Sequence, residues 1–212
     1  TTVSFANTST ADDVTIIRSL DPTDISISTG GVDFDGTGDY LEAGGGTDMQ
    51  LGTGDFTIET FVYFNSVASG QIYEGRPNGV QGAYISIYLE NGSDGTADLK
   101  FYTDSADRID ATDSIVASQW YHIAAVRNSS LTTLYIDGVS KGTYADTSDY
   151  TVRTDGPVLG ISRNLSNNPL NGTLSNYRIV KGRALYTTDF YPPSAELTNV
   201  ADTKLLCCQS DS

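Results

Sequence analysis

Hydrophobic and polar residues alternate along most of this chain with a period of two. In the segment FTIETFVYF, for example, Phe56, Ile58, Val62 and Phe64 fall on one side. Such alternation is typical of β-strands that bury one face, and no window places apolar residues at helical spacing with caps at both ends. The predicted strands are 14–17, 25–28, 32–34, 56–64, 83–89, 99–103, 108–111, the two arms of 120–142, 158–161, 173–180 and 204–209.

Residues 120–142, WYHIAAVRNSSLTTLYIDGVSKG, predict a run of antiparallel strands. The segment alternates, breaks at Asn128-Ser129-Ser130, alternates again and turns at Asp137-Gly138. Asp-Gly between two β-type runs is a strong hairpin signal, because a type I′ turn requires positive φ at both central residues. Many short strands joined by short turns favour an all-β, antiparallel two-sheet sandwich.

The charge of the chain narrows its possible partners. The net charge is −15, from 27 acidic and 12 scattered basic residues. Nucleic-acid binding needs concentrated Lys and Arg, so we exclude it, and no segment has the length of a membrane-spanning helix. A neutral sugar or another protein chain is the expected partner, because the negative surface repels acidic ones.

The cysteines and the first residues bear on the setting of the protein. Cys207 and Cys208 are adjacent, so a bridge between them would be strained and a disulfide framework is not expected. This favours folding in a reducing compartment. The start TTVSFANTST shows no signal peptide and no Met, and we expect it to be processed or cut from a longer chain.

Three motifs, in this order, carry a resemblance to a known family. They are GDFTIETFVYF at 54–64, QWYHIAAVRN…LTTLYIDGVSKG at 119–142 and NGTLSNYRIVKGRALYTTDFYPP at 171–193. Together they resemble concanavalin A-like, laminin G and pentraxin-type jelly-roll domains. The resemblance implies an all-β jelly-roll sandwich over residues 31–212, preceded by an N-terminal extension with short strands at 1–30. It also implies adjacent chain ends, with the last strand returning beside the strand 32–34.

The C-terminal stretch has a more particular resemblance. YTTDFYPPSAELTNVADTKLLCCQS at 186–210 is similar to the ends of laminin G-like modules in structural and tail-fibre proteins of marine bacteriophages. This resemblance implies a place on the virion surface, among other virion protein chains. An extracellular setting is the alternative.

Tyrosines on two predicted strands form the candidate ligand-binding face. The aliphatic side chains of AYISIYL at 83–89 face one way, whereas Tyr84, Ser86 and Tyr88 face the other, and Tyr102 is placed in the same way on a neighbouring strand. Aromatic rings stack on sugars or anchor protein interfaces, because they are large, rigid and half polar. The alternatives are a subunit contact and an ordinary exposed strand face.

A glycine-rich turn is the candidate metal site. DFDGTGDY carries Asp33, Asp35 and Asp39, and carboxylates are the ligands that Ca²⁺ prefers. The family resemblance implies a structural calcium held by an acid at the position of Ser175, and this chain lacks that acid. The alternative is a simple Asp/Gly turn without metal.

The only histidine of the chain, His122, is interpreted as structural. No nucleophile motif or partner carboxylate stands out in the sequence to make it a catalytic base. A glycosidase would need two carboxylates placed around the scissile bond, and none of the five Glu stands in such a cluster. We therefore expect a protein that is not an enzyme.

The sequence as a whole predicts a non-enzymatic, virion-associated adhesion module that recognises a glycan or a host surface receptor. A capsid-decorating or fibre-building protein is the structural alternative, and a glycoside hydrolase comes third. Ca²⁺ is the one cofactor considered, and a homo-oligomer is left open.

Overall fold

The computed structural model describes residues 30–92, 94–164 and 166–209. In these ranges the chain forms thirteen β-strands and no α-helix, which confirms the all-β prediction. Accordingly, the described residues contain no helix long and apolar enough to span a membrane. The strands predicted at 14–17 and 25–28, and nearly all of the predicted extension, lie outside the described residues.

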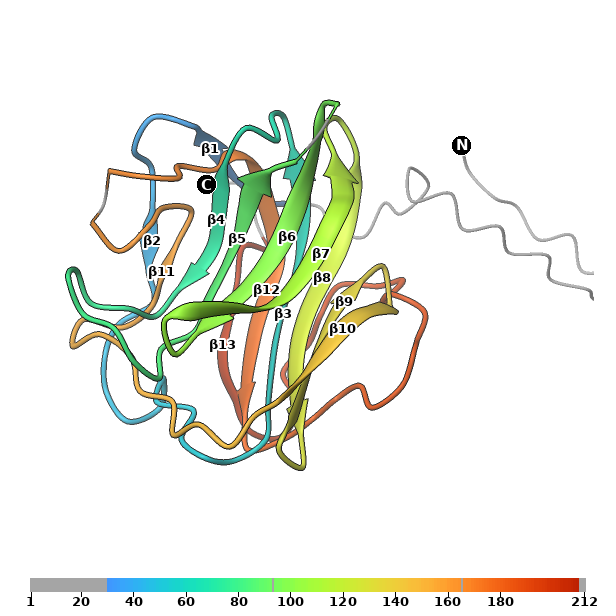
Figure 1. The fold of residues 1–212 in the computed structure, drawn as a ribbon. Coiled ribbons are helices and arrows are strands. Elements are labelled where there is room, and N and C mark those ends of the chain that lie inside the picture. Colours follow the sequence, from blue (N-terminus) through green and yellow to red (C-terminus); the bar gives the residue numbers. More distant parts are fainter. Residues whose placement is uncertain (1–29, 93, 165, 210–212) are drawn as a thin grey trace, which may run out of the picture.

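The strands form two antiparallel sheets that make a sandwich (Figure 1). Sheet A has the order β1-β12-β3-β8-β9-β10, with β13 also paired to β12. Its strands are β1 (Val32–Asp35), β3 (Phe56–Phe64), β8 (Trp120–Asn128), β9 (Leu131–Ile136), β10 (Val139–Ala145), β12 (Asn171–Lys181) and β13 (Thr203–Cys207). Sheet B has the order β2-β11-β4-β5-β6-β7. Its strands are β2 (Leu41–Glu42), β4 (Gly70–Glu74), β5 (Ser86–Asn91), β6 (Thr96–Thr103), β7 (Ala106–Val116) and β11 (Val158–Leu159).

The core lies between the sheets and consists of the alternating apolar side chains. Phe56, Ile58 and Phe64 of β3 are buried there, as predicted, and Ile87 and Leu89 of β5 pack into the same cluster. Burial of each such side chain stabilises the fold by roughly 1.5–3 kcal/mol. The predicted alternation therefore identifies the core face of both sheets.

Several strands differ from their predicted bounds. β6 and β7 extend beyond the predicted segments 99–103 and 108–111, and β5 begins at Ser86 rather than at residue 83. β4 was not predicted: its sequence GQIYE is buried at every position, so no alternation of exposed and buried residues marks it.

β1 and β13 lie end to end along one edge of β12. β1 pairs with the first half of β12 and β13 with the second half. Between them, Ser175 Oγ donates a hydrogen bond to the carbonyl of Gly30, and the Asn176 amide donates to the carbonyl of Cys208. The ends of the described chain are therefore adjacent, as predicted. β1 and β13 do not pair with each other, however, so the predicted side-by-side arrangement is wrong.

The predicted Asp-Gly turn joins β9 to β10. Asp137 and Gly138 have φ of 52° and 75°, the two positive values that this hairpin requires. The turn has a second role, because the Phe190 amide donates a hydrogen bond to the Gly138 carbonyl. It therefore contacts a segment far along the chain.

That segment, residues 183–201, covers the outer face of sheet A and is called the strap below (Figure 1). The rings of Tyr186 and Phe190 stack 3.6 Å apart. They pack on an apolar patch of β8 and β9 formed by Ala124, Val126 and Tyr135. Sheet A is thus apolar on both faces at this point, which explains the buried run IAAVR in β8.

A buried carboxylate holds the strap to the sheet. Glu59 of β3 accepts hydrogen bonds from Arg178 Nη2 of β12 at 2.6 Å and from the Tyr186 hydroxyl at 2.8 Å. His122 Nε2 of β8 lies 3.1 Å from the same carboxylate. Arg178 also donates to the Thr198 carbonyl. Three strands and both halves of the strap are therefore joined at one side chain.

His122 is buried beside Phe61, with ring centroids 4.7 Å apart, which agrees with a packed structural residue. Nε2 faces the Glu59 carboxylate, and within the part of the chain that the structure describes Nδ1 has no hydrogen-bond partner.

Loss of the Glu59 carboxylate should destabilise the protein strongly. Burial alone would raise the pKa of Glu59, but the hydrogen bond from His122 and the charges of His122 and Arg178 lower it below its usual value. The folded state therefore gains stability above the pKa of the unfolded chain and loses it as pH falls through the folded pKa. We expect Glu59→Gln to cost about 3–5 kcal/mol at neutral pH, since it leaves Arg178 buried without a counter-charge.

Urea unfolding of Glu59→Gln at several pH values measures this cost. The difference from the parent protein should shrink in acid, where Glu59 of the parent is itself protonated. Glu196→Gln is the matched control, because Glu196 is an exposed residue of the strap. Equal stability of the two variants would show that Glu59 does not hold the strap.

The Asp-Gly turn provides a second test of strap docking. A Cβ at position 138 would lie 1.8 Å from the Phe190 carbonyl oxygen, so Gly138→Ala must displace the strap. Gly44→Ala is the control, because Gly44 has φ of +72° and no atom within 4 Å of its added Cβ. Both variants bear about 1–2 kcal/mol of backbone strain, and Gly138→Ala should cost clearly more. Thermal unfolding and limited proteolysis at Arg183 measure the difference, and equal losses would contradict the contact.

Candidate functional site

The outer face of sheet B brings three of the four predicted ligand-binding residues together. In the register of β5 and β6, Ser86 lies opposite Tyr102 and Tyr88 lies opposite Lys100. Directly opposed residues of antiparallel strands share a face. These four residues, on the face turned away from the core, are called the tyrosine face below. Both tyrosines are half-buried, and their role in binding stays a prediction.

Tyr84, the fourth predicted residue, lies outside β5 instead of in the predicted strand 83–89. A bend with φ of +130° at Gly82 precedes it, and its amide donates to the Gly82 carbonyl. β5 begins only at Ser86. The strand alternation that grouped Tyr84 with Tyr88 therefore does not extend to it.

The two rings of the tyrosine face are held in place by hydrogen bonds. The Tyr88 hydroxyl donates to Asp107 at 2.8 Å, and the Tyr102 hydroxyl donates to Gln81 at 2.8 Å. Burial and the bond to Asp107 raise the pKa of Tyr88, so its phenol stays neutral. The Arg76 guanidinium lies 4.4 Å from the centroid of the Tyr102 ring, within the range of a cation–π contact. A ligand would therefore meet ordered rings.

Ser86 positions other groups rather than meeting solvent. Its side chain is buried, and its hydroxyl accepts hydrogen bonds from Gln71 Nε2 at 2.7 Å and from Arg76 Nη2 at 3.1 Å. Arg76 also forms a fork with the buried Glu74 carboxylate, with Nε and Nη2 at 2.8 and 2.7 Å from its oxygens. Ser86 thus helps to orient Arg76.

Lys100 gathers three carboxylates on the tyrosine face. Its Nζ lies 2.6 Å from Asp110 and 3.2 Å from both Asp98 and Glu90. Burial lowers the pKa of Lys100, but the hydrogen bonds to these three acids outweigh it and raise the pKa overall. The ammonium is therefore charged, and each acid serves it as an ion-pair partner.

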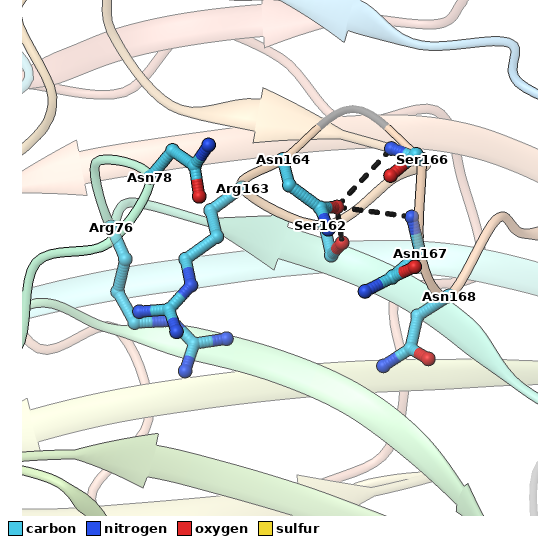
Figure 2. A pocket seen from close by; sticks show the side chains of 8 residues that line it. All are labelled: Arg76, Asn78, Ser162, Arg163, Asn164, Ser166, Asn167 and Asn168. Carbon is cyan, nitrogen blue, oxygen red and sulfur yellow. Dashed lines mark hydrogen bonds between the residues drawn. The ribbon is translucent and has the colours of Figure 1, made fainter.

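A pocket of about 470 Å³ adjoins the tyrosine face, between the β4–β5 loop and the β11–β12 loop (Figure 2). Sites for small ligands commonly have this size. Every described residue that lines it is polar or charged: Arg76, Asn78, Ser162, Arg163, Asn164, Ser166, Asn167 and Asn168. Since Arg76 also contacts Tyr102, the pocket and the tyrosine face are continuous.

Hydrogen bonds within the β11–β12 loop order this pocket. Asn164 Oδ1 accepts from the Ser162 hydroxyl and from the amides of Ser166 and Asn167, as the dashed lines in Figure 2 show. Arg163 Nη1 donates to the Val80 carbonyl at 2.9 Å, which links the two loops. In the same view both guanidinium groups lie in one part of the pocket, with Asn167 and Asn168 in another.

Sequence reasoning missed this pocket. The available signal was the pair of short segments RPN at 76–78 and SRNLSNN at 162–168, where arginines stand among asparagines in an otherwise acidic chain. Their approach depends on a contact between residues 83 positions apart, which no local pattern reports.

The predicted metal residues line a different pocket, at β1. Asp33, Asp35 and Asp39 surround it together with Tyr63. Asp35 accepts hydrogen bonds from the Thr37 hydroxyl and amide, which lower its pKa. The Asp39 carboxylate accepts from the Asp35 amide. These contacts are those of a turn stabilised by its own side chains.

Among the described residues, no three His, Cys, Asp or Glu side chains are grouped as a metal site would require. Calcium at Asp33, Asp35 and Asp39 therefore stays a prediction. A melting temperature that falls on addition of EGTA would support it, because a metal that binds only the folded state stabilises that state. Identical melts with calcium and with EGTA would remove it.

Solved structures of similar fold include proteins named for carbohydrate binding. A proposed carbohydrate-binding protein from Bacteroides ovatus has a TM-score of 0.63 and 14% identity, over 86% of this chain and 51% of that one. This chain thus spans about half the length of that protein.

Two shorter proteins match over most of their own length. A heptameric SAP-like pentraxin from Limulus polyphemus gives a TM-score of 0.55 and 15% identity, over 84% of this chain and 92% of that one. The CBM40 of the Ruminococcus gnavus IT-sialidase, bound to α2,3 sialyllactose, gives a TM-score of 0.52 and 14% identity, over 75% of this chain and 92% of that one. At these identities the likeness concerns the fold. No curated protein sequence matches the chain significantly.

The sequence itself matches a family model. Residues 35–189 fit the model of the concanavalin A-like lectin/glucanases superfamily, of laminin G type. The match covers more than half of the chain and includes the whole of β3, β8, β9 and β12, the strands that form the centre of sheet A. The chain therefore belongs to the concanavalin A-like lectin/glucanases superfamily.

Proposed function

We propose that this protein is a non-enzymatic glycan-binding module whose binding surface is the tyrosine face of sheet B. The observation that carries the proposal is the asymmetry of the sandwich. On the outer face of sheet A the strap covers the apolar patch of β8 and β9, whereas on the outer face of sheet B Tyr88 and Tyr102 lie half-buried beside a polar pocket.

The chemistry of this surface suits a sugar. A sugar ring offers apolar C–H groups on its faces and hydroxyls at its edge, and aromatic rings beside polar groups complement both. Tyr88 and Tyr102 supply the rings, and Lys100 with its acids supplies donors and acceptors around them. Because both phenols are already hydrogen-bonded, little conformational freedom is lost on binding.

The acids of the tyrosine face favour binding over hydrolysis. A glycosidase needs one carboxyl group that holds a proton to give and a second that stays ionised. Glu90, Asp98 and Asp110 instead share one ammonium, and an ion pair requires the ionised carboxylate. The buried Glu59 and His122 lie beneath the strap, out of reach of a substrate.

The similar structures support the same function. The Bacteroides ovatus protein is named for carbohydrate binding, and the Ruminococcus gnavus module is bound to a sialylated sugar. We further propose that the module acts in adhesion at a virion surface, from the resemblance of residues 186–210 to bacteriophage modules. Detection of the chain in purified particles tests that setting, and its absence from them would leave an extracellular module.

Removal of the two rings should weaken glycan binding without unfolding the protein. We expect Tyr88→Ala and Tyr102→Ala each to lower affinity by about tenfold, and the double variant by more, as for the loss of an aromatic contact. Glycan-array binding followed by calorimetry measures the effect. The loss should be similar at low and high salt, because ring stacking does not depend on released counterions.

Tyr191→Ala is the control, because Tyr191 is 82% exposed and belongs to the strap on sheet A. Circular dichroism and melting temperature check the fold of each variant. If both tyrosine variants bind glycans as the parent does, the surface is misassigned. If the double variant binds cells normally but is missing from particles, the decoration role is favoured instead.

A further inference from the structure

The pocket beside the tyrosine face differs in charge from the rest of the molecule. The chain carries 27 acidic residues against 12 basic ones. The described lining of the pocket nevertheless has two arginines, four asparagines and two serines, and no carboxylate. A pocket built from guanidinium, amide and hydroxyl groups can donate many hydrogen bonds. Its composition indicates a ligand rich in acceptors.

The two arginines of the pocket do not have the same electrostatic state. The charge of Arg76 is neutralised by its fork with Glu74. Burial lowers the pKa of Arg76, but the hydrogen bond to Glu74 and the charge of Glu74 raise it overall. The guanidinium of Arg163 donates one hydrogen bond within the described structure, to the uncharged Val80 carbonyl. Across residues 30–92, 94–164 and 166–209, no acid lies within ion-pair distance of Arg163. The positive charge of the pocket therefore belongs to Arg163.

Arg163 is held where it could meet a ligand. Its bond to Val80 ties it to the β4–β5 loop. Its own loop is closed by Asn164 and by the Ser162 amide, which donates to the Asn167 carbonyl. Arg163 is half-buried, so part of its guanidinium remains open to the pocket. A planar guanidinium presents a rigid fork of donors that matches a carboxylate better than a point charge does.

We propose that this pocket binds the carboxylate of an acidic sugar, with Arg163 as its specificity-determining residue. The proposal rests on the proposed glycan-binding function and names the class of glycan. The acid group pairs with Arg163, while the rest of the saccharide extends past Arg76 onto Tyr102 and Tyr88. Continuity of the pocket and the tyrosine face makes one elongated site of them.

This inference departs from the neutral partner that the net charge predicts. Net charge acts over long distances, and at physiological salt it is screened beyond about 8 Å. Within the pocket itself the described lining offers the Arg163 guanidinium and no carboxylate. A sugar with a single carboxylate per residue suits one unpaired guanidinium, whereas a densely sulfated chain would bring many more charges against a surface of net charge −15.

The test compares saccharides that differ only in the acid group. Tri-galacturonate and 3′-sialyllactose are each measured against their carboxyl-reduced forms by calorimetry on the full chain. We expect the parent protein to bind at least one acidic form about tenfold more tightly than its neutral counterpart, as a charge-assisted hydrogen-bonded pair provides. This comparison needs no variant.

Variants then assign the preference to Arg163. Arg163→Gln should abolish the tenfold difference by lowering affinity for the acidic form, whereas Arg163→Lys, which keeps the charge but not the fork, should lie between the two. Arg183→Gln is the matched control, because Arg183 is exposed on the strap. Lactose 3′-sulfate distinguishes a carboxylate site from a general anion site.

Each outcome has a definite meaning. Equal affinity for acidic and neutral forms, with binding still dependent on Tyr88 and Tyr102, overturns the carboxylate pocket and leaves the glycan-binding proposal standing. A preference that survives in Arg163→Gln, or tighter binding of the sulfate than of either carboxylate, also overturns it. Failure to bind any of the saccharides, acidic or neutral, together with an empty glycan array, counts against both proposals.

Discussion

The carboxylate of Glu59 is the constraint on which the arrangement of this molecule depends. It is buried, and an ionised carboxylate is tolerated there only because Arg178, His122 and Tyr186 surround it. Tyr186 belongs to the strap, so the charge is satisfied only when the strap is docked. Closure of the outer face of sheet A over β8 and β9 is therefore coupled to the electrostatics of the centre of that sheet.

On sheet B, Arg76 joins neighbouring groups much as Glu59 does on sheet A. Its fork with Glu74, its bond to Ser86 and its contact with Tyr102 fix one guanidinium across the boundary between sheet and loop. The ion pair with Glu74 neutralises the charge of Arg76. Arg163 lines the same pocket but is distant in sequence, and its described side-chain hydrogen bond goes to the uncharged Val80 carbonyl. A strongly acidic protein can thus present a small positive site, because one arginine supplies the structure and the other remains unpaired.

Local patterns in the sequence identify the parts of this fold that depend on local physics. The alternation around Ile87 and the Asp137-Gly138 turn were both predicted, because side-chain direction and turn conformation depend on adjacent residues. Tyr84 was predicted to lie in a strand but falls outside β5, which begins only at Ser86, after a bend at Gly82. The partner of His122 could not be predicted, since Glu59 lies 63 positions away on another strand. The pocket at Arg163 could not be predicted either, since it depends on a contact between residues 83 positions apart.

The two ends of the described chain meet at Ser175 and Asn176 of β12, and this has a mechanical consequence. Tension on either end acts first on the hydrogen bonds nearest the middle of β12, where β1 starts and β13 stops. A pull directed away from the sheet would break these bonds one after another, because each strand is loaded at one tip rather than along its length. Under force, the domain would therefore give way by peeling of an edge strand from sheet A before sheet B is distorted.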